Sequence, residues 1–224
     1  MAKFIDLCHR LVNGMKTYPE YPGIVIDIYL TRDQTAARYG KNANSVIDRI
    51  QMLNCTGTYL DAPFHRKEAG YKVADIPLEK CVNLDYEVVE LTPGKNCFDS
   101  GDLTDKGIKG GAILLCSGES ENFGKEGYGV NGAYLTAEGA KYLMDRGVVF
   151  VGIDTALIDC MWHSHDWGNP VHDTILDAGA VVCEDMNNLK AAIPYAGKGK
   201  LFAAPLKIEM GSISTRVYVM VDED

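Results

Sequence analysis

The sequence predicts one α/β domain built around a mixed β-sheet. Six short runs of apolar and β-branched residues, bounded by Gly, Asp or Pro, are typical of buried strands. Two amphipathic stretches in the second half predict helices that alternate with those strands. The chain has 224 residues, of which 46% are hydrophobic, so it is long enough for one sizeable core and too short for two generous domains. We therefore expect a single domain that spans residues 1–224.

The expected elements follow from local patterns along the chain. The strands span 24–30, 86–91, 112–116, 148–153, 180–183 and 215–221. The helices span 137–146 and 171–178, and residues 186–193 could form a third. Thr136 is a good N-cap for the first helix and Gly147 ends it. Pro170 suits the first turn of the second helix, and Gly179 closes it. Strands exceed helices, which favours a mixed sheet over a doubly wound parallel one.

Composition and charge exclude several classes of protein. No run approaches the roughly 18 apolar residues that a membrane helix needs. A net charge of -9 argues against a nucleic-acid partner, whose phosphates require clustered Lys and Arg. No GxGxxG follows a strand and no Walker-type loop is present. Asp6 stands where a secretory signal would need apolar residues. The seven Cys are scattered and form no CxxC pair. We therefore expect reduced thiols and a cytoplasmic location.

Reactive residue types concentrate in residues 54–65, NCTGTYLDAPFH. If this segment is extended, the strand period of two places four residues on one face: Cys55, Gly57, Tyr59 and Asp61. Gly57 would then leave space for a ligand or ion to approach the backbone. Pro63 would end the strand and place His65 on the following turn. A thiol, a phenol, a carboxylate and an imidazole are therefore expected to converge.

This window resembles the H-x-G-T-H-x-D-x-P-x-H signature of the cyclase-like metal-dependent hydrolases, the family of bacterial kynurenine formamidase and isatin hydrolase. Further segments match the family in order: IDLCH at 5–9, YPG at 21–23, VGIDT at 151–155, PVH at 170–172, CEDMNNL at 183–189 and APLKI at 204–208. The resemblance implies the family's swivelling β/β/α fold, a small-molecule substrate, and a homodimer or homotetramer.

The resemblance also implies roles for individual residues. Asp61, His172 and Glu184 would hold a divalent ion, zinc or manganese. His65 would be the general acid/base. Tyr21 lies where the family has an aromatic-Pro-Gly turn that contributes to the substrate pocket.

The two imidazoles of the family's other ion position are replaced by Cys55 and Tyr59. Cys55 is a candidate thiolate ligand, a candidate nucleophile activated by His65, or a small buried residue. Tyr59 is a poor metal ligand, because a phenol ionises near pH 10, and substrate packing or a hydrogen bond suits it better. His163 and His165 suit either a metal or anion site or an exposed loop.

These observations predict a metal-dependent hydrolase of a small amide, an aryl-formamide or a lactam. The ion would lower the pKa of bound water, and His65 would move the proton. One alternative is a metal-free lyase or cyclase that uses Cys55 and His65; another is a degenerate family member that only binds a small ligand. The polar segment 31–43 is either a lid over the pocket or an ordinary surface loop.

Overall fold

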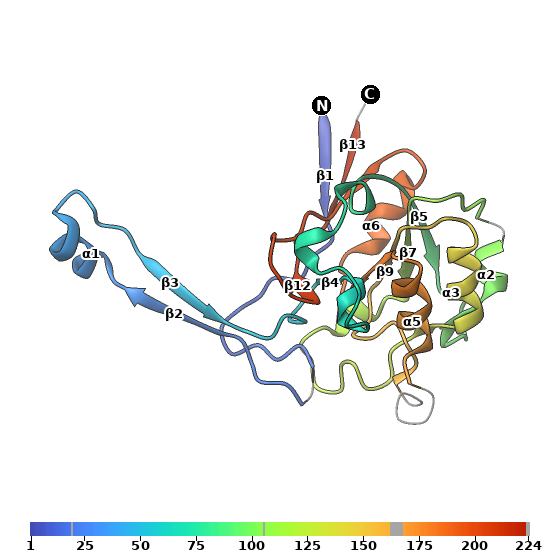
Figure 1. The fold of residues 1–224 in the computed structure, drawn as a ribbon, viewed down its shortest axis with the longest axis horizontal. Coiled ribbons are helices and arrows are strands. Elements are labelled where there is room, and N and C mark those ends of the chain that lie inside the picture. The colour runs from blue at the N-terminus through green and yellow to red at the C-terminus, as the bar shows by residue number, and fades with distance from the viewer. Residues whose placement is uncertain (19, 105, 162–167, 223–224) are drawn as a thin grey trace.

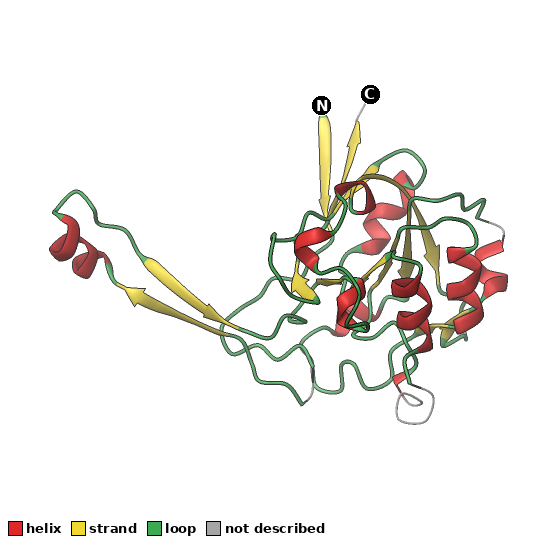
Figure 2. Ribbon diagram, in the orientation of Figure 1, coloured by secondary structure: helices red, strands yellow, loops and turns green. Residues whose placement is uncertain are grey.

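The molecule consists of a body and a slender arm that projects from it (Figure 1). The computed structural model describes residues 1–18, 20–104, 106–161 and 168–222. Figure 2 shows that the body combines a curled sheet with short helices, whereas the arm is a two-stranded ribbon with a helix at its tip.

A nine-stranded mixed sheet forms the centre of the body, in the order β1-β13-β11-β5-β7-β9-β10-β4-β12. Its four central strands are parallel: β5 (Val82–Glu90), β7 (Ala112–Cys116), β9 (Phe150–Ile153) and β10 (Val181–Glu184). Antiparallel strands flank them: β1 (Ala2–Asp6), β13 (Tyr218–Asp222), β11 (Lys200–Phe202), β4 (Tyr59–Asp61) and β12 (Ser212–Ser214). The predicted mixed sheet is confirmed.

Side chains of the central strands alternate between two hydrophobic clusters, one on each face of the sheet. Ile113 and Leu115 pack with three helices on one face: α2 (Ser100–Thr104), α3 (Ala137–Met144) and α5 (Pro170–Asp177). Leu114 packs on the other face with α6 (Leu189–Ala192) and the terminal strands. The sheet is thus buried on both sides, as its continuous apolar runs require.

Several short elements complete the body. A small parallel pair joins β6 (Cys97–Phe98) to β8 (Tyr134–Leu135). Single 3-10 turns lie at η1 (Pro63–His65), η2 (Val73–Asp75), η3 (Leu78–Lys80), η4 (Glu119–Asn122) and η6 (Ile193–Tyr195). No helix in the described part of the chain is both long and apolar enough to cross a membrane.

The expected helices match α3 and α5 closely, and the third one is shorter than expected. The prediction of an extended segment over 55–61 is wrong for its first half, because β4 begins only at Tyr59. Gly57 has φ +66, and a Cβ there would lie 2.5 Å from Cδ2 of Leu11. This glycine therefore serves a turn and close packing, and not the approach of a ligand.

The arm contains residues 25–51. Strands β2 (Val25–Leu30) and β3 (Ile47–Gln51) pair antiparallel, and α1 (Arg32–Tyr39) lies at their far end. Thr31 and the side chain of Gln34 form a capping box that fixes the start of α1. Segment 31–43, expected as a lid or a loop, is thus largely a helix that lies far from the body of its own chain (Figure 1).

Candidate active site

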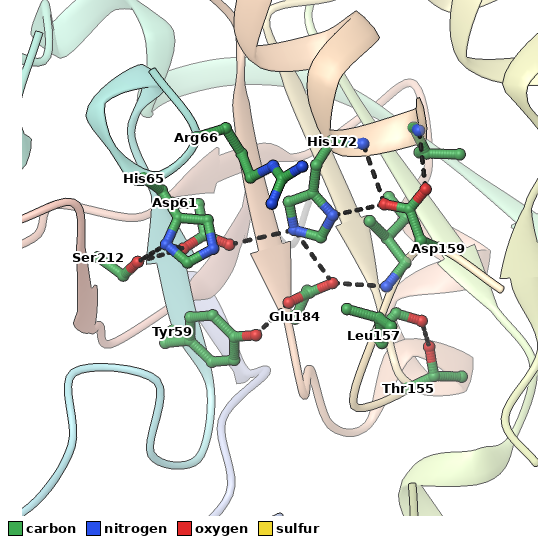
Figure 3. A network of polar contacts seen from close by, with 12 residues as sticks. Tyr59, Asp61, His65, Arg66, Thr155, Leu157, Asp159, His172, Glu184 and Ser212 are labelled. Carbon is green, nitrogen blue, oxygen red and sulfur yellow. Dashed lines mark hydrogen bonds and ion pairs between the residues drawn. The ribbon is translucent and has the colours of Figure 1, made fainter. Parts of the chain in front are cut away.

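Three neighbouring strands place the polar residues of the site side by side. Asp61 on β4 lies directly opposite Ser212 on β12, and Tyr59 lies directly opposite Glu184 on β10. Directly opposite residues on antiparallel strands have adjacent side chains. The turn η1, which Pro63 opens, then brings His65 back to the same place (Figure 3). The prediction that Pro63 ends the strand and positions His65 is confirmed.

His172 is held by a carboxylate that the sequence did not reveal. Its Nδ1 lies 2.6 Å from Oδ2 of Asp159, and Asp159 also accepts hydrogen bonds from the backbone N–H groups of His172 and Val171. Asp159 thereby fixes both the start of α5 and the orientation of the ring. The free Nε2 of His172 lies 3.6 Å from Oδ2 of Asp61 and 3.6 Å from Oε1 of Glu184.

Ser212 determines which nitrogen of His65 carries a proton. Its hydroxyl contacts Oδ1 of Asp61 and lies 2.9 Å from Nδ1 of His65. An ionised carboxylate only accepts, so the single hydroxyl proton goes to Asp61, and Nδ1–H of His65 must donate to the serine oxygen. The neutral ring of His65 therefore presents a lone pair on Nε2. Gly211 permits this approach, because a Cβ there would lie 2.9 Å from Cα of His65.

The site has the features of a cation-binding centre. Oδ2 of Asp61 is buried and has no hydrogen-bond partner within the described part of the chain. One ligand atom from each of Asp61, His65 and His172 lies within 4.8 Å of the other two. A buried carboxylate oxygen without a partner is costly. A divalent ion that accepts oxygen and nitrogen ligands would satisfy it. This cluster shares Asp61 and His172 with the ligand set that the resemblance implies, but it contains His65 in place of Glu184, whose Oε1 lies 3.6 Å from Nε2 of His172.

The pKa values of His172 and Glu184 also indicate that positive charge is favourable at this site. Burial opposes the charged form of His172, yet the neighbouring Glu184, Asp159 and Asp61 raise its pKa well above the ordinary value. Burial, together with the charge of Asp61, raises the pKa of Glu184 to about 7, while His172 opposes that shift. Two carboxylates thus lie beside the same ring nitrogen of His172, and positive charge there, on the ring or on a bound cation, offsets their repulsion.

Two further groups of the site, Tyr59 and Cys55, are neutral. Tyr59 is buried and donates its hydroxyl hydrogen bond to Oε2 of Glu184. Burial, together with the charge of Glu184, raises the pKa of Tyr59 well above 10. Burial and the charge of Asp61 raise the pKa of the Cys55 thiol to about 11. Neither group is an anion near pH 7, which argues against a thiolate nucleophile at Cys55.

A cavity of about 200 Å³ opens onto these groups. It is lined by Tyr18, Tyr21, Cys55, Tyr59, His65, Ala156, Leu157, Asn169, His172, Glu184 and Asp185. The rings of Tyr18 and Tyr21 stack with their centroids 4.8 Å apart and form an aromatic wall. The structure therefore brings every predicted site residue to one place, Asp61 lying just beneath the cavity surface.

Among the residues that shape the site, the sequence did not reveal the roles of Tyr18, Asp159 and Ser212. Tyr18 is close to the predicted Tyr21 and could have been found from the aromatic cluster there. Asp159 and Ser212 lie in no motif, and only the fold brings them to His172 and His65. His163 and His165 lie outside the described residues.

Comparison with known proteins places the chain in a family. The family model described as "Putative cyclase" matches residues 5–160, more than half of the chain. The chain belongs to this family. Among curated proteins, it is 25% identical over 158 residues to a kynurenine formamidase of Bacillus cytotoxicus, covering 70% of this chain and 71% of that protein. It is 28% identical over 179 residues to a kynurenine formamidase of Salinibacter ruber, covering 78% and 80%.

Solved structures share the fold of this family member. Isatin hydrolase A from Labrenzia aggregata, bound to benzyl benzoate, superimposes with a TM-score of 0.83 at 21% identity, covering 99% of this chain and 94% of that one. A structure described as a potential metal-dependent hydrolase with cyclase activity gives a TM-score of 0.78 at 24% identity, with both chains fully covered. The fold assignment is confirmed, and the relatives support a hydrolase of the cyclase family.

Proposed function

We propose that this cyclase-family protein is a metal-dependent hydrolase of a small amide, either an aryl-formamide or a lactam. The observation that carries the proposal is the buried Oδ2 of Asp61, which has no hydrogen-bond partner among the described residues and faces Nε2 of His172. The names of the relatives, kynurenine formamidase and isatin hydrolase, support the substrate class.

Asp61, His172 and Glu184 would hold the ion, which is zinc or manganese. When bound, it supplies Lewis acidity that polarises a carbonyl and lowers the pKa of water. Asp159 keeps Nε2 of His172 pointed at the site, through the 2.6 Å contact with Nδ1. Tyr59 holds Oε2 of Glu184, while the backbone N–H of Ile158 donates to Oε1 at 2.5 Å. Each ligand is thus oriented by a partner of its own.

His65 would be the general acid/base. The hydrogen bond from its Nδ1–H to Ser212 leaves the lone pair of Nε2 available. The side chain is 36% exposed, so it borders the cavity instead of lying beneath it. Nε2 would take a proton from the attacking water and return it to the leaving amine.

The aromatic wall would bind the aryl group of the substrate. Tyr18 and Tyr21 present stacked rings at the cavity, and Tyr59 borders it from the strand side. Offset or edge contacts between aromatic rings favour a flat substrate here. A metal-free lyase or cyclase that uses Cys55 is disfavoured, because burial keeps the thiol protonated near pH 7.

Metal loading and hydrolysis, measured together, test the proposal. Purified chain is loaded with zinc or manganese, dialysed, and its metal content is measured by elemental analysis. An aryl-formamide and the lactam isatin are then offered as substrates. We expect about one ion per chain and turnover of at least one substrate. Asp61→Asn should lose both.

The matched control is Asp177→Asn, which removes an exposed carboxylate that pairs with Lys67 at the surface. It should retain both the ion and the activity. Absence of any ion after loading would overturn the metal-dependent mechanism. A bound ion without turnover of either substrate would leave the metal site standing and overturn the substrate class.

A further inference from the structure

The two imidazoles of the site lie on different elements of the fold. His65 is at the end of η1, which follows β4, whereas His172 is in the first turn of α5. Their ring centroids are 5.9 Å apart, and each ring contributes a ligand atom to the cluster around Asp61. Ser212 holds His65 to the sheet, and Asp159 holds His172 at the start of α5. Neither contact joins η1 to α5, so the separation of the two rings depends on what holds one element against the other.

In the described part of the chain, two ion pairs join the residues that follow η1 to α5. Arg66 donates from Nε to Oδ1 of Asp173 at 3.0 Å. Lys67 pairs with Asp177, one turn further along the same face of the helix. The side chains of the first pair are 33% and 48% exposed, and those of the second are 47% and 44% exposed. The two pairs are therefore similar in what they contribute to stability, which is little for exposed ion pairs.

The two pairs differ in their distance from the imidazoles. Arg66 directly follows His65, and Asp173 directly follows His172. The first pair therefore joins the two backbone positions that are adjacent to the two imidazoles. Figure 3 shows the Arg66 side chain extending from the side of His65 toward His172. The second pair lies further along both segments from the imidazoles.

We propose that Arg66 and Asp173 are positioning residues, whose ion pair clamps η1 to the first turn of α5 and so fixes the distance between the imidazoles of His65 and His172. This inference rests on the proposed function, in which His65 moves the proton and His172 holds the ion. Neither Arg66 nor Asp173 is among the residues that line the cavity, so the pair acts through the two histidines and not on the substrate.

A contact that contributes little to stability can still control a rate. A displacement of about 1 Å between reacting groups can lower a rate by up to about a hundredfold, even when the altered residue lies away from the chemistry. The clamp therefore predicts a loss of activity that exceeds the loss of stability.

Steady-state kinetics of the metal-loaded chain tests the clamp. Arg66→Gln removes the charge that pairs with Asp173 and should lower kcat about tenfold, with KM and metal content unchanged. Lys67→Gln is the matched control, because it removes the same charge from the neighbouring residue and breaks the other pair between the same two segments. Its kcat should stay within about twofold of wild type, and both variants should lose at most about 4 °C in melting temperature. Equal kcat values in the two variants would overturn the clamp.

Two further variants show whether Arg66 acts through Asp173. Arg66→Lys keeps the positive charge and should recover kcat to within about threefold of wild type, because the contact is a single hydrogen bond and not a bidentate one. The double variant Arg66→Gln/Asp173→Asn should be no slower than Arg66→Gln alone, since residues that act only through their contact are coupled. Effects that multiply in the double variant would contradict the proposal.

Crystal structures of the metal-free chain give a readout that does not depend on activity. The ring centroids of His65 and His172 should move apart by about 1 Å in Arg66→Gln and keep the wild-type separation in Lys67→Gln. An unchanged separation in Arg66→Gln would overturn the proposal even if kcat falls. A wild-type chain that hydrolyses neither substrate would overturn the proposed function instead, and the ring separations would still decide whether the clamp exists.

Discussion

The residues retained from the family signature and the two that replace its imidazoles differ in how their polar groups are satisfied. Among the retained residues, His172 and His65 each have Nδ1 fixed by a partner, Asp159 and Ser212 respectively. Of the two replacing residues, Tyr59 already donates its hydroxyl hydrogen bond to Glu184, and the Cys55 thiol is kept neutral by burial. The retained residues thus include two imidazoles that line the cavity, whereas the replacing pair has no group that is ionised near pH 7.

This difference fits the single ion position of the proposed function. Where the family signature has a pair of imidazoles, this chain has a phenol and a thiol. The phenol donates to Glu184 and so orients a proposed ligand. A hydrogen bond between a buried phenol and a carboxylate satisfies both groups. In the proposed function, the replacing residues therefore support the retained ones.

The largest effect should follow from changing His65, the proposed base among the retained residues. His65→Gln should lower kcat by about 10²–10⁴-fold, the usual contribution of general acid/base catalysis, while about one ion per chain remains bound. Elemental analysis and steady-state kinetics on the same preparation separate the two effects. Loss of the ion from this variant would instead assign His65 as a ligand.

The second effect concerns the carboxylate behind His172. Asp159→Asn keeps the size of the side chain but removes the charge that faces Nδ1. The affinity for the ion should fall by about 10–100-fold, as it does when such outer partners are lost. Isothermal titration with zinc measures this change. Equal affinity in the variant and the wild type would show that α5 alone positions the ring of His172. The control is Asp145→Asn, which changes an exposed carboxylate at the surface.

Most of the fold could be predicted from the sequence, because its elements are local patterns. The apolar run at 112–116 and the capped helix that begins at Ala137 are specified by residues next to one another. The arm could not be predicted in this way. Its strand β3 is exposed at every residue, and alternation around Asp48 and Arg49 carries little hydrophobic signal.

The site shows the same division between local and long-range information. Tyr59, Asp61 and His65 share one short window, so their convergence could be predicted. Ser212 comes 151 residues after Asp61 and meets it only because β12 pairs with β4. No spacing rule in the sequence connects two strands so far apart, and the tautomer of His65 depends on that pairing.

A smaller effect should follow from removing that serine. Ser212→Ala leaves Nδ1 of His65 without its acceptor, so the lone pair is no longer held on Nε2. Loss of one hydrogen bond of ordinary strength predicts a fall in kcat of about fivefold to tenfold, with KM unchanged. Nitrogen NMR of the His65 ring gives a direct readout, because its two tautomers have distinct shifts.

In wild type the Nδ1–H form should dominate, and in Ser212→Ala the two forms should mix. Ser214→Ala is the matched control, since Ser214 lies on the same strand as Ser212 and its hydroxyl donates to the backbone carbonyl of Thr56. A variant at position 212 that keeps the wild-type tautomer would show that the backbone alone orients His65.

The smallest effect should come from Cys55, one of the two replacing residues. Because the Cys55 thiol has a pKa of about 11, the thiolate is a minor species at pH 7.5, and Cys55→Ser should change kcat/KM by less than about threefold. Each pH unit below the pKa lowers the fraction of thiolate about tenfold. Because the pKa of Cys55 is raised from 9.0 to about 11, its alkylation at pH 7.5 should be about a hundredfold slower than that of an ordinary thiol. The rate should rise with pH up to about 11. Peptide mass spectrometry after iodoacetamide treatment measures it, with a free cysteine peptide as reference. Fast alkylation at pH 7.5 together with loss of activity in Cys55→Ser would restore the hypothesis of a thiolate nucleophile, and the retained and replacing residues would then both take part in the reaction.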